Sequence, residues 1–285
     1  MTKLKIAIQK SGRLKDDSLK LLKQCGISVD NGKDQLKASA SNFPLEIFYL
    51  RNSDIPKYIE DGVVNLGIVG ENLLYELNSK LEVVRPLGFS KCKVSIAVPV
   101  TENPADISFF EGKKVATSYP NTTRKYFESK GVETSIHKIS GSVEIAPNIG
   151  LADAICDIVS SGSTLFKNGL KESDVIMKSE AVLVKEPQST KEINTLIAKL
   201  DFRIKAVLSA KSSKYILMNV PNQRIAEVSS LLPVLKSPTI VPLAEEGWSS
   251  LQTVIQENDF WDVIDKLKNA GAEGILVSPI EKIIL

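Results

Sequence analysis

Short apolar stretches, each followed by a polar turn and then by a helical pattern, recur along most of this chain. Residues 3–9 are rich in Ile and Leu and alternate with polar residues, which predicts a strand. The leucines of residues 14–24 fall on one face of a helix, and Gly26 is placed to end it. A strand, a helix and another strand in that order are typical of a parallel sheet with crossover helices. The chain is therefore predicted to be an α/β protein.

The same order of elements continues up to residue 168. Further strands are predicted at residues 45–51, 64–69, 94–98, 114–116 and 152–159. Helices are predicted at residues 122–129, 143–150 and 163–168. One more helix is expected to begin after Asp54, which would cap it, and to end at Gly62. The stretches from Ile55 and from Val143 share one order of elements, which indicates a duplication and two lobes with a ligand cleft between them.

A different pattern begins past Lys211. A long amphipathic helix with a polar start is predicted from Lys185, and a β-α-β-β-α-β order follows it, which is ferredoxin-like. Its strands are predicted at residues 215–220, 239–243, 253–257 and 274–278, and its helices at 223–232 and 260–270. By analogy, such a small appended domain senses a metabolite. We expect residues 1–92 and 180–208 to form lobe I, 93–179 to form lobe II and 211–285 to form the C-terminal domain.

Composition and charge exclude several classes of protein. The chain has 36 basic and 34 acidic residues, whereas proteins that coat nucleic acid usually have a strong basic excess. Its three cysteines are far apart and His137 is the only histidine, so we expect neither a zinc site nor a Ser-His-Asp triad. The charged N-terminus does not resemble a signal peptide, and no apolar run is long enough to cross a membrane. We therefore expect a cytoplasmic protein without nucleic-acid or membrane partners.

The segment from Asp157 to Thr164 combines the residue types of a phosphate site. The turn that follows its strand consists of Ser160, Ser161, Gly162, Ser163 and Thr164. Backbone N–H groups at a helix start and hydroxyl groups donate hydrogen bonds to phosphate oxygens, and glycine permits a close approach. Asp157 would accept hydrogen bonds from sugar hydroxyls. The alternative is an N-capped helix without a ligand, and the motif alone does not decide between the two.

Two other segments bring cations to the ends of predicted strands. Gln9, Lys10, Gly12 and Arg13 precede a helix, where the two cations suit a phosphate. A solvated loop with surface charges is the alternative. Arg51 ends a strand, where it would either stabilise a departing pyrophosphate or form a surface ion pair.

The last two segments carry an acid, an amide and an aromatic ring. Glu71 and Asn72 follow a buried strand and would reach the rim of the cleft, unless they only cap the next helix. Tyr119 offers a flat face on which a purine can stack, unless it is a core residue. Each segment is ambiguous alone. All five, however, stand at the carboxyl ends of predicted parallel strands, where open α/β sheets bind ligands.

Several stretches resemble the long form of the ATP phosphoribosyltransferase family. They are QKSGR from Gln9, GVVNLGIVGEN from Gly62, KVATSYPN from Lys114 and, above all, the stretch from Ser142 to Leu165. SKYILMNVP, LPVLKSPTIVPLA and GAEGILVSPIEKI resemble the family's regulatory domain. The resemblance implies two lobes like type II periplasmic binding proteins around a cleft, with a C-terminal ferredoxin-like (ACT-like) α+β domain.

The resemblance also implies an activity. The family transfers the phosphoribosyl group of phosphoribosyl pyrophosphate to N1 of ATP, releases pyrophosphate and so begins histidine biosynthesis. It further implies a requirement for Mg²⁺, feedback inhibition by histidine and a homo-oligomer that exchanges between hexamer and dimer. Magnesium would be held mainly by substrate oxygens, so no metal site of the protein's own is expected.

Site residues follow from the resemblance by position. Asp157 and the turn 160–164 would hold the 5′-phosphate and ribose, while Lys10 and Arg51 would supply catalytic positive charge. The nucleotide side would comprise Gln9, Lys10, Gly12, Arg13, Glu71, Asn72 and Tyr119. The histidine site would comprise Asn219, Leu232, Ser237, Pro238 and Thr239. Asn219 stands where some relatives carry an acid that pairs with the histidine amine, so the inhibitor would bind differently or more weakly here.

Two other functions fit the same pattern. A solute-binding module would also hold a ligand between two lobes, but the chain has no secretion signal and such a module rarely carries a ferredoxin-like domain. A catalytically idle regulatory partner would share the fold, and the intact segment from Asp157 to Thr164 weighs against it. Release of pyrophosphate from ATP and phosphoribosyl pyrophosphate would distinguish the enzyme from both.

Overall fold

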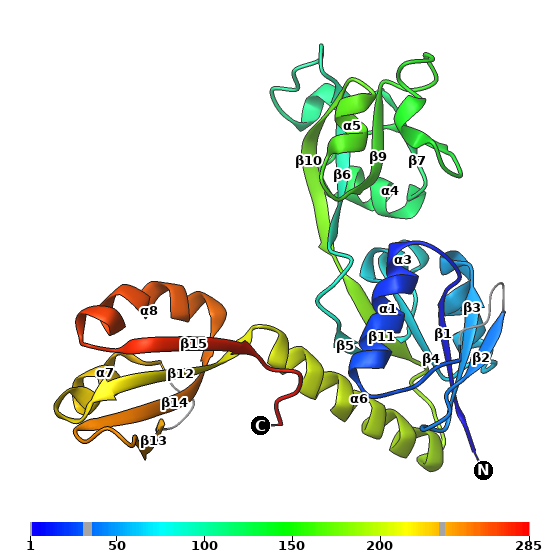
Figure 1. Ribbon diagram of the computed structural model, residues 1–285. Helices are drawn as coiled ribbons and strands as arrows, with labels where there is room; N and C mark the ends of the chain where they lie inside the picture. The colour runs from blue at the N-terminus through cyan, green and yellow to red at the C-terminus, as the bar shows by residue number, and fades with distance from the viewer. Residues whose placement is uncertain (1, 31–35, 234–236, 285) are drawn as a thin grey trace. The chain divides into compact units, whose positions relative to one another are not determined.

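A computed structural model describes residues 2–30, 36–233 and 237–284 of the chain (Figure 1). Contacts divide the chain into two units, Met1–Lys23 with Ile27–Ala198, and Gln24–Gly26 with Lys199–Leu285. The first unit contains two separate sheets, each with its own helices. We call the part built on the first sheet lobe I and the part built on the second sheet lobe II. Within the described ranges, no helix has the length and apolar character needed to cross a membrane.

Lobe I is built on a six-stranded sheet of order β2-β3-β1-β4-β11-β5. The strands are β1 (Leu4–Gln9), β2 (Lys37–Ser39), β3 (Leu45–Leu50), β4 (Leu66–Gly70), β5 (Glu82–Pro86) and β11 (Ala181–Lys185). The helices are α1 (Arg13–Gln24), α2 (Ile55–Glu60) and α3 (Glu71–Leu77), and the 3-10 helix η1 (Asn52–Asp54) precedes α2. Strand β1 runs parallel to β3 and β4, as the sequence predicts, while β11 runs antiparallel to β4. The carboxyl ends of β1, β3 and β4 therefore share one edge.

Lobe II is built on a five-stranded sheet of order β10-β6-β9-β7-β8. The strands are β6 (Cys92–Pro99), β7 (Lys114–Thr117), β8 (Ser135–Lys138), β9 (Ala154–Val159) and β10 (Leu170–Ser179). The helices are α4 (Pro120–Ser129) and α5 (Ser163–Lys167), with 3-10 helices η2 (Ile107–Phe110) and η3 (Val143–Ile145). Strand β7 runs parallel to β8 and β9. The rings of Phe110 and Phe127 pack in the lobe II core with their centroids 5.4 Å apart.

Two chain crossings join the lobes, one from β5 to β6 and one from β10 to β11. The five polar segments singled out in the sequence follow β1, β3, β4, β7 and β9. Each of these strands has a parallel neighbour, so the segments collect at the carboxyl edges of the two sheets, as predicted.

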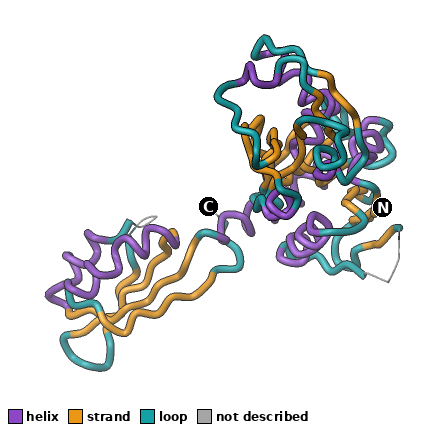
Figure 2. Tube along the Cα trace, turned by 90° about the horizontal axis from the view of Figure 1, so that it is seen from above, coloured by secondary structure: helices purple, strands orange, loops and turns teal. Residues whose placement is uncertain are grey.

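The C-terminal unit is ferredoxin-like, as expected. It follows the helix α6 (Lys191–Lys211), which begins in the first unit. Its elements are β12 (Ser213–Pro221), η4 (Asn222–Arg224), α7 (Ile225–Leu231), β13 (Thr239–Pro242), β14 (Trp248–Gln256), α8 (Glu257–Asn269) and β15 (Glu273–Pro279). The sheet order is β13-β14-β12-β15, and α7 and α8 cover one face of the sheet (Figure 2). Met218, Leu251 and Phe260 belong to the core between this face and the helices. The α/β two-lobe fold with an added α+β domain is therefore confirmed.

Three local predictions were wrong. Residues 143–150 form the single 3-10 turn η3 and further turns instead of a helix, because Pro147 has no N–H to donate to a continuing helix. Asp54 makes no side-chain cap bond to α2, and its carboxylate instead accepts a hydrogen bond of 2.9 Å from the Ser53 hydroxyl. The long helix also begins six residues later than expected, at Lys191 and not at Lys185.

Candidate functional site

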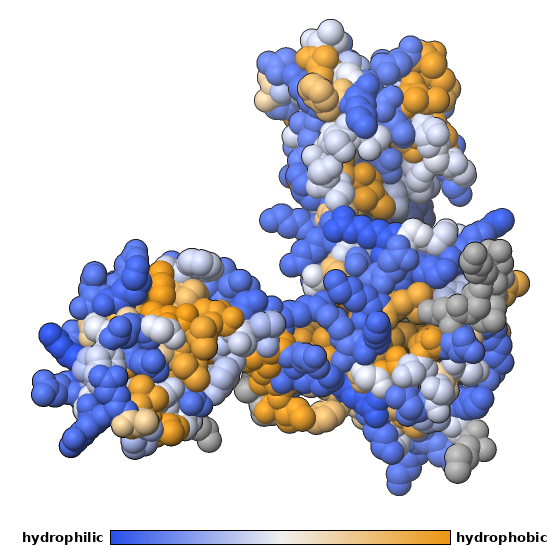
Figure 3. Space-filling model, in the orientation of Figure 1, coloured by the Kyte–Doolittle hydropathy of each residue, from blue (hydrophilic) through white to orange (hydrophobic). Residues whose placement is uncertain are grey.

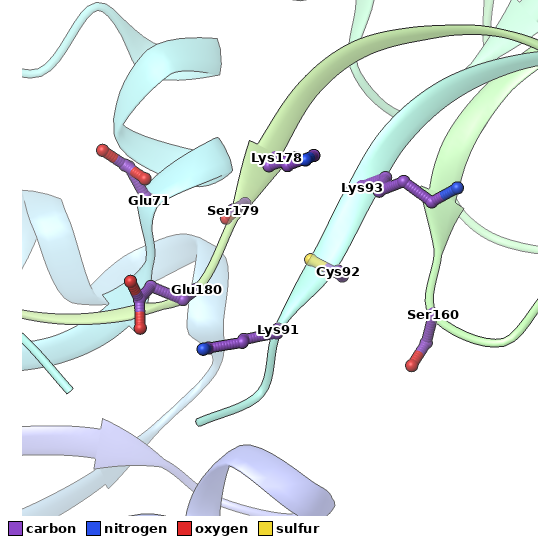
Figure 4. A pocket seen from close by; sticks show the side chains of 8 residues that line it. All are labelled: Glu71, Lys91, Cys92, Lys93, Ser160, Lys178, Ser179 and Glu180. Atoms are coloured by element: carbon purple, nitrogen blue, oxygen red, sulfur yellow. The ribbon is translucent and has the colours of Figure 1, made fainter. Parts of the chain in front are cut away.

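A cleft of about 530 Å³ lies where the chain crosses between the lobes (Figure 4). Its lining consists of Glu71, Lys91, Cys92, Lys93, Ser160, Lys178, Ser179 and Glu180. Glu71 begins α3 in lobe I, and Ser160 follows β9 in lobe II. Lys91 and Glu180 lie on the two crossings, and the other four residues lie at the ends of β6 and β10 next to them, so both lobes and both crossings bound the cleft. Its volume is in the range of small-molecule sites.

The cleft lining carries the three lysines Lys91, Lys93 and Lys178 beside the two glutamates Glu71 and Glu180. Lys93 is paired with Glu172 at 2.6 Å, whereas Lys91 and Lys178 are exposed and make no ion pair within the described ranges. Two ammonium groups are therefore available to an anion. The sequence analysis missed both lysines, because they lie on extended chain at the crossings and not in a turn after a strand. In the sequence, the two lysines are marked only by their position directly before Cys92 and Ser179, which does not indicate an anion site.

Lys10 and Arg51 leave the lobe I sheet next to each other. The Lys10 backbone N–H donates a hydrogen bond of 2.8 Å to the carbonyl oxygen of Leu50, which extends the pairing of β1 with β3 by one residue. Both side chains are exposed, and Gln9 beside them is half-buried. The structure thus brings these three predicted residues together at one sheet edge, although they are not part of the lining of the 530 Å³ cleft.

Gly12 and Arg13 form the start of α1 at the same edge. Gly12 has a φ of +85°, a conformation that favours glycine, and it turns the chain from β1 into the helix. The guanidinium of Arg13 lies 3.8 Å from the Asp17 carboxylate and is largely exposed. Asp17 in turn accepts a hydrogen bond of 3.2 Å from the hydroxyl of Ser90, on the first crossing. Arg13 is therefore held near the crossing while its charge stays open to solvent.

The turn at residues 160–164 is open, as a phosphate site requires. Its four hydroxyl residues, Ser160, Ser161, Ser163 and Thr164, are exposed. Gly162 has a φ of +74°, and the hydroxyls of Ser161 and Ser163 lie 3.0 Å apart. Helix α5 has only five residues, so its dipole adds less potential than a longer helix would supply. Donation from hydroxyls and N–H groups, not the helix dipole, is what this turn offers an anion.

Asp157 lies in β9, two residues before the strand ends and the turn begins, and it is half-buried. Burial raises the pKa of its carboxyl above the ordinary value, the Ile158 N–H opposes the shift, and the charge of Glu144 adds to it. A partly desolvated carboxylate is a strong acceptor for hydroxyl groups. The position of Asp157 is thus suited to the ribose hydroxyls that the sequence analysis assigned to it.

Tyr119 lies two residues after the end of β7, the strand next to β9 in the lobe II sheet, and it is half-buried. Burial raises the pKa of its phenol far above the ordinary value, and the charge of Asp157 adds to the rise. The phenol is therefore protonated at neutral pH. Its oxygen accepts a hydrogen bond of 3.1 Å from the Asn72 side-chain amide.

Asn72 differs from the expectation of a residue at the cleft rim. Its side chain is only 4% exposed, and its Oδ1 accepts a hydrogen bond of 2.9 Å from the hydroxyl of Ser179. Because its amide nitrogen is bonded to Tyr119, the side chain connects α3, the second crossing and lobe II inside the protein. Glu71, one residue earlier, does line the cleft.

The residues assigned to a histidine site lie in two different environments. Asn219 is half-buried on the sheet face opposite the core, and Ser237 and Thr239 are exposed near the start of β13, with Pro238 half-buried between them. Leu232 is 6% exposed and packs in the core of the C-terminal unit, so its side chain does not face a ligand. Residues 234–236 of the expected segment lie outside the described residues.

Carboxylates near the cleft are few. The described part of the chain contains no group of three or more His, Cys, Asp or Glu residues arranged to hold a metal. Glu71 and Glu180 both line the cleft. One or two carboxylates together with substrate phosphates are the usual ligands of Mg²⁺, so these residues fit a metal that arrives with the substrate.

Comparisons with known proteins give matches over nearly the whole chain. The family described as ATP phosphoribosyltransferase matches residues 51–206, and the HisG C-terminal domain matches residues 210–282. The ATP phosphoribosyltransferase of Cytophaga hutchinsonii is 56% identical over 99% of this chain and 99% of its own. That of Phocaeicola vulgatus is 50% identical over 99% and 100%. The ATP phosphoribosyl transferase (HisG:HisZ) complex from Thermotoga maritima has a TM-score of 0.60 and 30% identity, over 70% of this chain and 98% of that one.

Proposed function

The chain belongs to the ATP phosphoribosyltransferase family, and we propose that the cleft between lobes I and II is its active site. The reaction transfers the phosphoribosyl group of phosphoribosyl pyrophosphate to N1 of ATP and begins histidine biosynthesis. The observation that carries the proposal is a cleft lined by the exposed Ser160 and by Lys91 and Lys178, two exposed lysines that have no ion-pair partner within the described ranges. Hydroxyls suit a sugar phosphate, and ammonium groups suit a pyrophosphate.

The sugar phosphate is assigned to lobe II. The turn 160–164 donates hydrogen bonds to the 5′-phosphate through its hydroxyls and N–H groups, and Gly162 lets the backbone approach the phosphate. Asp157 accepts hydrogen bonds from the ribose hydroxyls. Support comes from the exposure of all four hydroxyl residues and from the place of Ser160 in the cleft lining.

The pyrophosphate is assigned to the cations. Lys91 and Lys178 line the cleft, and Lys10 and Arg51 lie at the lobe I sheet edge. Positive charge there stabilises the negative charge that develops as the pyrophosphate leaves the anomeric carbon. Glu71 or Glu180 would complete the coordination of a Mg²⁺ ion brought by substrate oxygens, and that ion would supply further positive charge to the leaving group.

The nucleotide is assigned to the lobe I edge and to Tyr119. Gln9, Gly12, Arg13 and Glu71 surround its phosphates and ribose, and Tyr119 stacks on the adenine. The adenine N1 lone pair forms the new bond to the anomeric carbon while the bond to pyrophosphate breaks, through an oxocarbenium-like transition state. The protein orients the two substrates, and no side-chain nucleophile takes part.

Histidine inhibition and self-association are assigned to the C-terminal unit. Asn219, Ser237, Pro238 and Thr239 are the polar or exposed positions of the expected inhibitor site, whereas Leu232 would support it from the core. Strands β13 and β15 form the two edges of the sheet and carry exposed Ile240 and Leu276. Apolar side chains gather on the visible face of this unit (Figure 3). Exposed apolar edges of this kind favour association of copies, in line with a homo-oligomer of dimers and hexamers.

The test is pyrophosphate release from ATP and phosphoribosyl pyrophosphate in the presence of Mg²⁺. Arg51→Ala and Lys178→Ala should each lower kcat/KM by at least about tenfold, because each removes a cation from the leaving group. Arg224→Ala, which removes an exposed arginine of the C-terminal unit, is the control. Turnover of Arg51→Ala within about twofold of the unmodified enzyme would show that its assigned role is wrong. Ligand binding without any pyrophosphate release would instead favour a solute-binding module.

A further inference from the structure

Glu76 is a buried carboxylate between the two lobes. It lies on α3 of lobe I and is only 7% exposed. It is absent from the cleft lining, and no step of the reaction described above uses it. A buried carboxylate is costly unless hydrogen bonds satisfy its oxygens, so its partners indicate what it does.

Among the described residues, every hydrogen-bond donor to its carboxylate belongs to lobe II. One carboxylate oxygen accepts the Asn121 backbone N–H at 3.0 Å, and the other accepts the Thr122 N–H and hydroxyl, each at 2.8 Å. The Asn121 side-chain amide also donates to the Glu76 backbone carbonyl at 3.0 Å. These donors form the first turn of α4. A side chain of one lobe therefore caps a helix of the other.

Helix α4 depends on this cap because its own N-cap residue does not supply a side-chain acceptor. Tyr119 occupies the N-cap position and makes no side-chain cap bond. The first N–H groups of a helix need acceptors from outside the helix, and a negative charge there is stabilised by the helix dipole. Within the described ranges no cation is paired with Glu76. The Glu76 carboxylate therefore needs the N–H groups of α4 as donors, and these N–H groups need the carboxylate as their acceptor.

A second bridge lies one helical turn earlier on α3. Asn72 and Glu76 are four residues apart and therefore share a helix face. Asn72 donates to the Tyr119 hydroxyl, and Glu76 accepts from Asn121 and Thr122 in the first turn of the helix that follows Tyr119. The face of α3 thus holds the Tyr119 hydroxyl directly and the Tyr119 backbone through the start of α4.

We propose that Glu76 is a positioning residue, which sets the distance between Tyr119 and the nucleotide-binding edge of lobe I. The proposal rests on the proposed function, in which the adenine stacks on Tyr119 and the ATP phosphates meet residues 9–13. Glu76 acts through α4 and touches neither substrate. Tyr119 of lobe II and residues 9–13 of lobe I can bind one nucleotide together only when the distance between them matches the length of that nucleotide.

The two substrates depend differently on this spacing. The 5′-phosphate turn and Asp157 belong to lobe II alone, so a sugar phosphate contacts one rigid part. ATP must contact both lobes. Loss of the Glu76 carboxylate should therefore weaken ATP binding and leave sugar-phosphate binding nearly unchanged, whereas a residue that only stabilises the fold would affect both or neither.

The experiment measures binding of ATP and of ribose 5-phosphate to the full chain by calorimetry. Glu76→Gln keeps the side-chain size but turns an amide NH₂ toward N–H donors. We expect its Kd for ATP to rise about tenfold or more, because hydrogen bonds to a charged group are lost, and its Kd for ribose 5-phosphate to stay within about twofold. Thr122→Val removes one donor to the same carboxylate and should raise the Kd for ATP by a smaller factor, even if Glu76→Gln folds poorly.

Asp106→Asn is the matched control. Its carboxylate also caps a helix, since Asp106 accepts the Ser108 N–H at 2.8 Å, but both partners lie within lobe II. Both dissociation constants should therefore match those of the unmodified protein. Equal weakening of the two ligands in the Glu76 and Thr122 variants, or no weakening of either, would overturn the positioning role. Failure of the unmodified protein to bind either ligand would overturn the proposed function itself.

Discussion

Replacing Gly67 by alanine should push α2 away from the lobe I sheet. Gly67 is the second residue of β4, and its φ is not in the left-handed region, so alanine causes no backbone strain there. A Cβ atom at this position would lie 2.6 Å from Ile55 Cγ2 and 2.7 Å from Ile59 Cδ1. The Ile59 methyl is the end of a side chain and can rotate away. The Ile55 methyl is attached directly to its Cβ, so the helix itself must move.

The expected cost follows from these distances. Carbon atoms pack best at about 3.5–4.0 Å, so α2 has to retreat by roughly 1 Å. Overpacking of this kind costs about 1–3 kcal/mol, and the reduced backbone entropy of alanine in the unfolded chain offsets about 0.5–1 kcal/mol of it. A net loss of about 1–2 kcal/mol should lower the melting midpoint of the first unit by about 2–8 °C.

Thermal unfolding followed by circular dichroism tests the prediction. Ile55→Ala, which removes the obstructing methyl, completes a double-mutant cycle, and the combined loss should be smaller than the sum of the single losses by about 0.5 kcal/mol or more. Gly26→Ala is a control for glycine removal where nothing lies within 4 Å, although its φ of +71° adds strain. An unchanged or higher midpoint for Gly67→Ala would refute the packing of α2 on β4.

Three further outcomes are expected. Gly162→Ala forces alanine to a φ of +74° in open space, so it should cost about 1 kcal/mol in unfolding and raise the KM for phosphoribosyl pyrophosphate in steady-state kinetics. Cys92 lines the cleft, whereas Cys156 is buried with its pKa raised to about 12; alkylation followed by mass spectrometry should therefore modify Cys92 first, and more slowly with both substrates bound. Hydrogen bonds from Ser108 lower the pKa of Asp106, so the stability that Asp106→Asn removes should be present at pH 7 and vanish as the pH falls through the folded-state pKa, as seen in unfolding at several pH values.

The sequence predicted the elements whose apolar pattern is regular. Strands β1, β3, β4, β7 and β9 were expected close to where they lie, because each is a buried apolar run followed by a turn. Strand β10 was missed, since register shifts after Glu172 and after Val175 interrupt its pairing with β6 and therefore its alternation. Residues 143–150 have a helical pattern, yet Pro147 and the positive φ of Ser142 produce turns. The local pattern of apolar residues predicts neither the register shifts of β10 nor the turns at residues 143–150.

For the candidate site, sequence position indicated the strand ends but not the contacts between lobes. The open turn at 160–164 and the edge that carries Lys10 follow from strand order alone. Lys91, Lys178 and Glu76 acquire their surroundings only when residues far apart in the sequence meet, 45 positions for Glu76 and Asn121 and 107 positions for Asn72 and Ser179. No local motif marks such residues. The roles assigned to individual side chains remain predictions for the experiments above.

The position of β11 between β4 and β5 has a consequence for biosynthesis. As the chain leaves the ribosome, every strand of lobe II is made before residues 181–185 appear. Until then β4 lacks its antiparallel neighbour, and β5 has no partner in the sheet. We expect lobe II to complete its fold first during translation and the earlier-made lobe I to close around β11 afterwards, so that the amino-terminal half of the protein is the last part of the first unit to become protease-resistant.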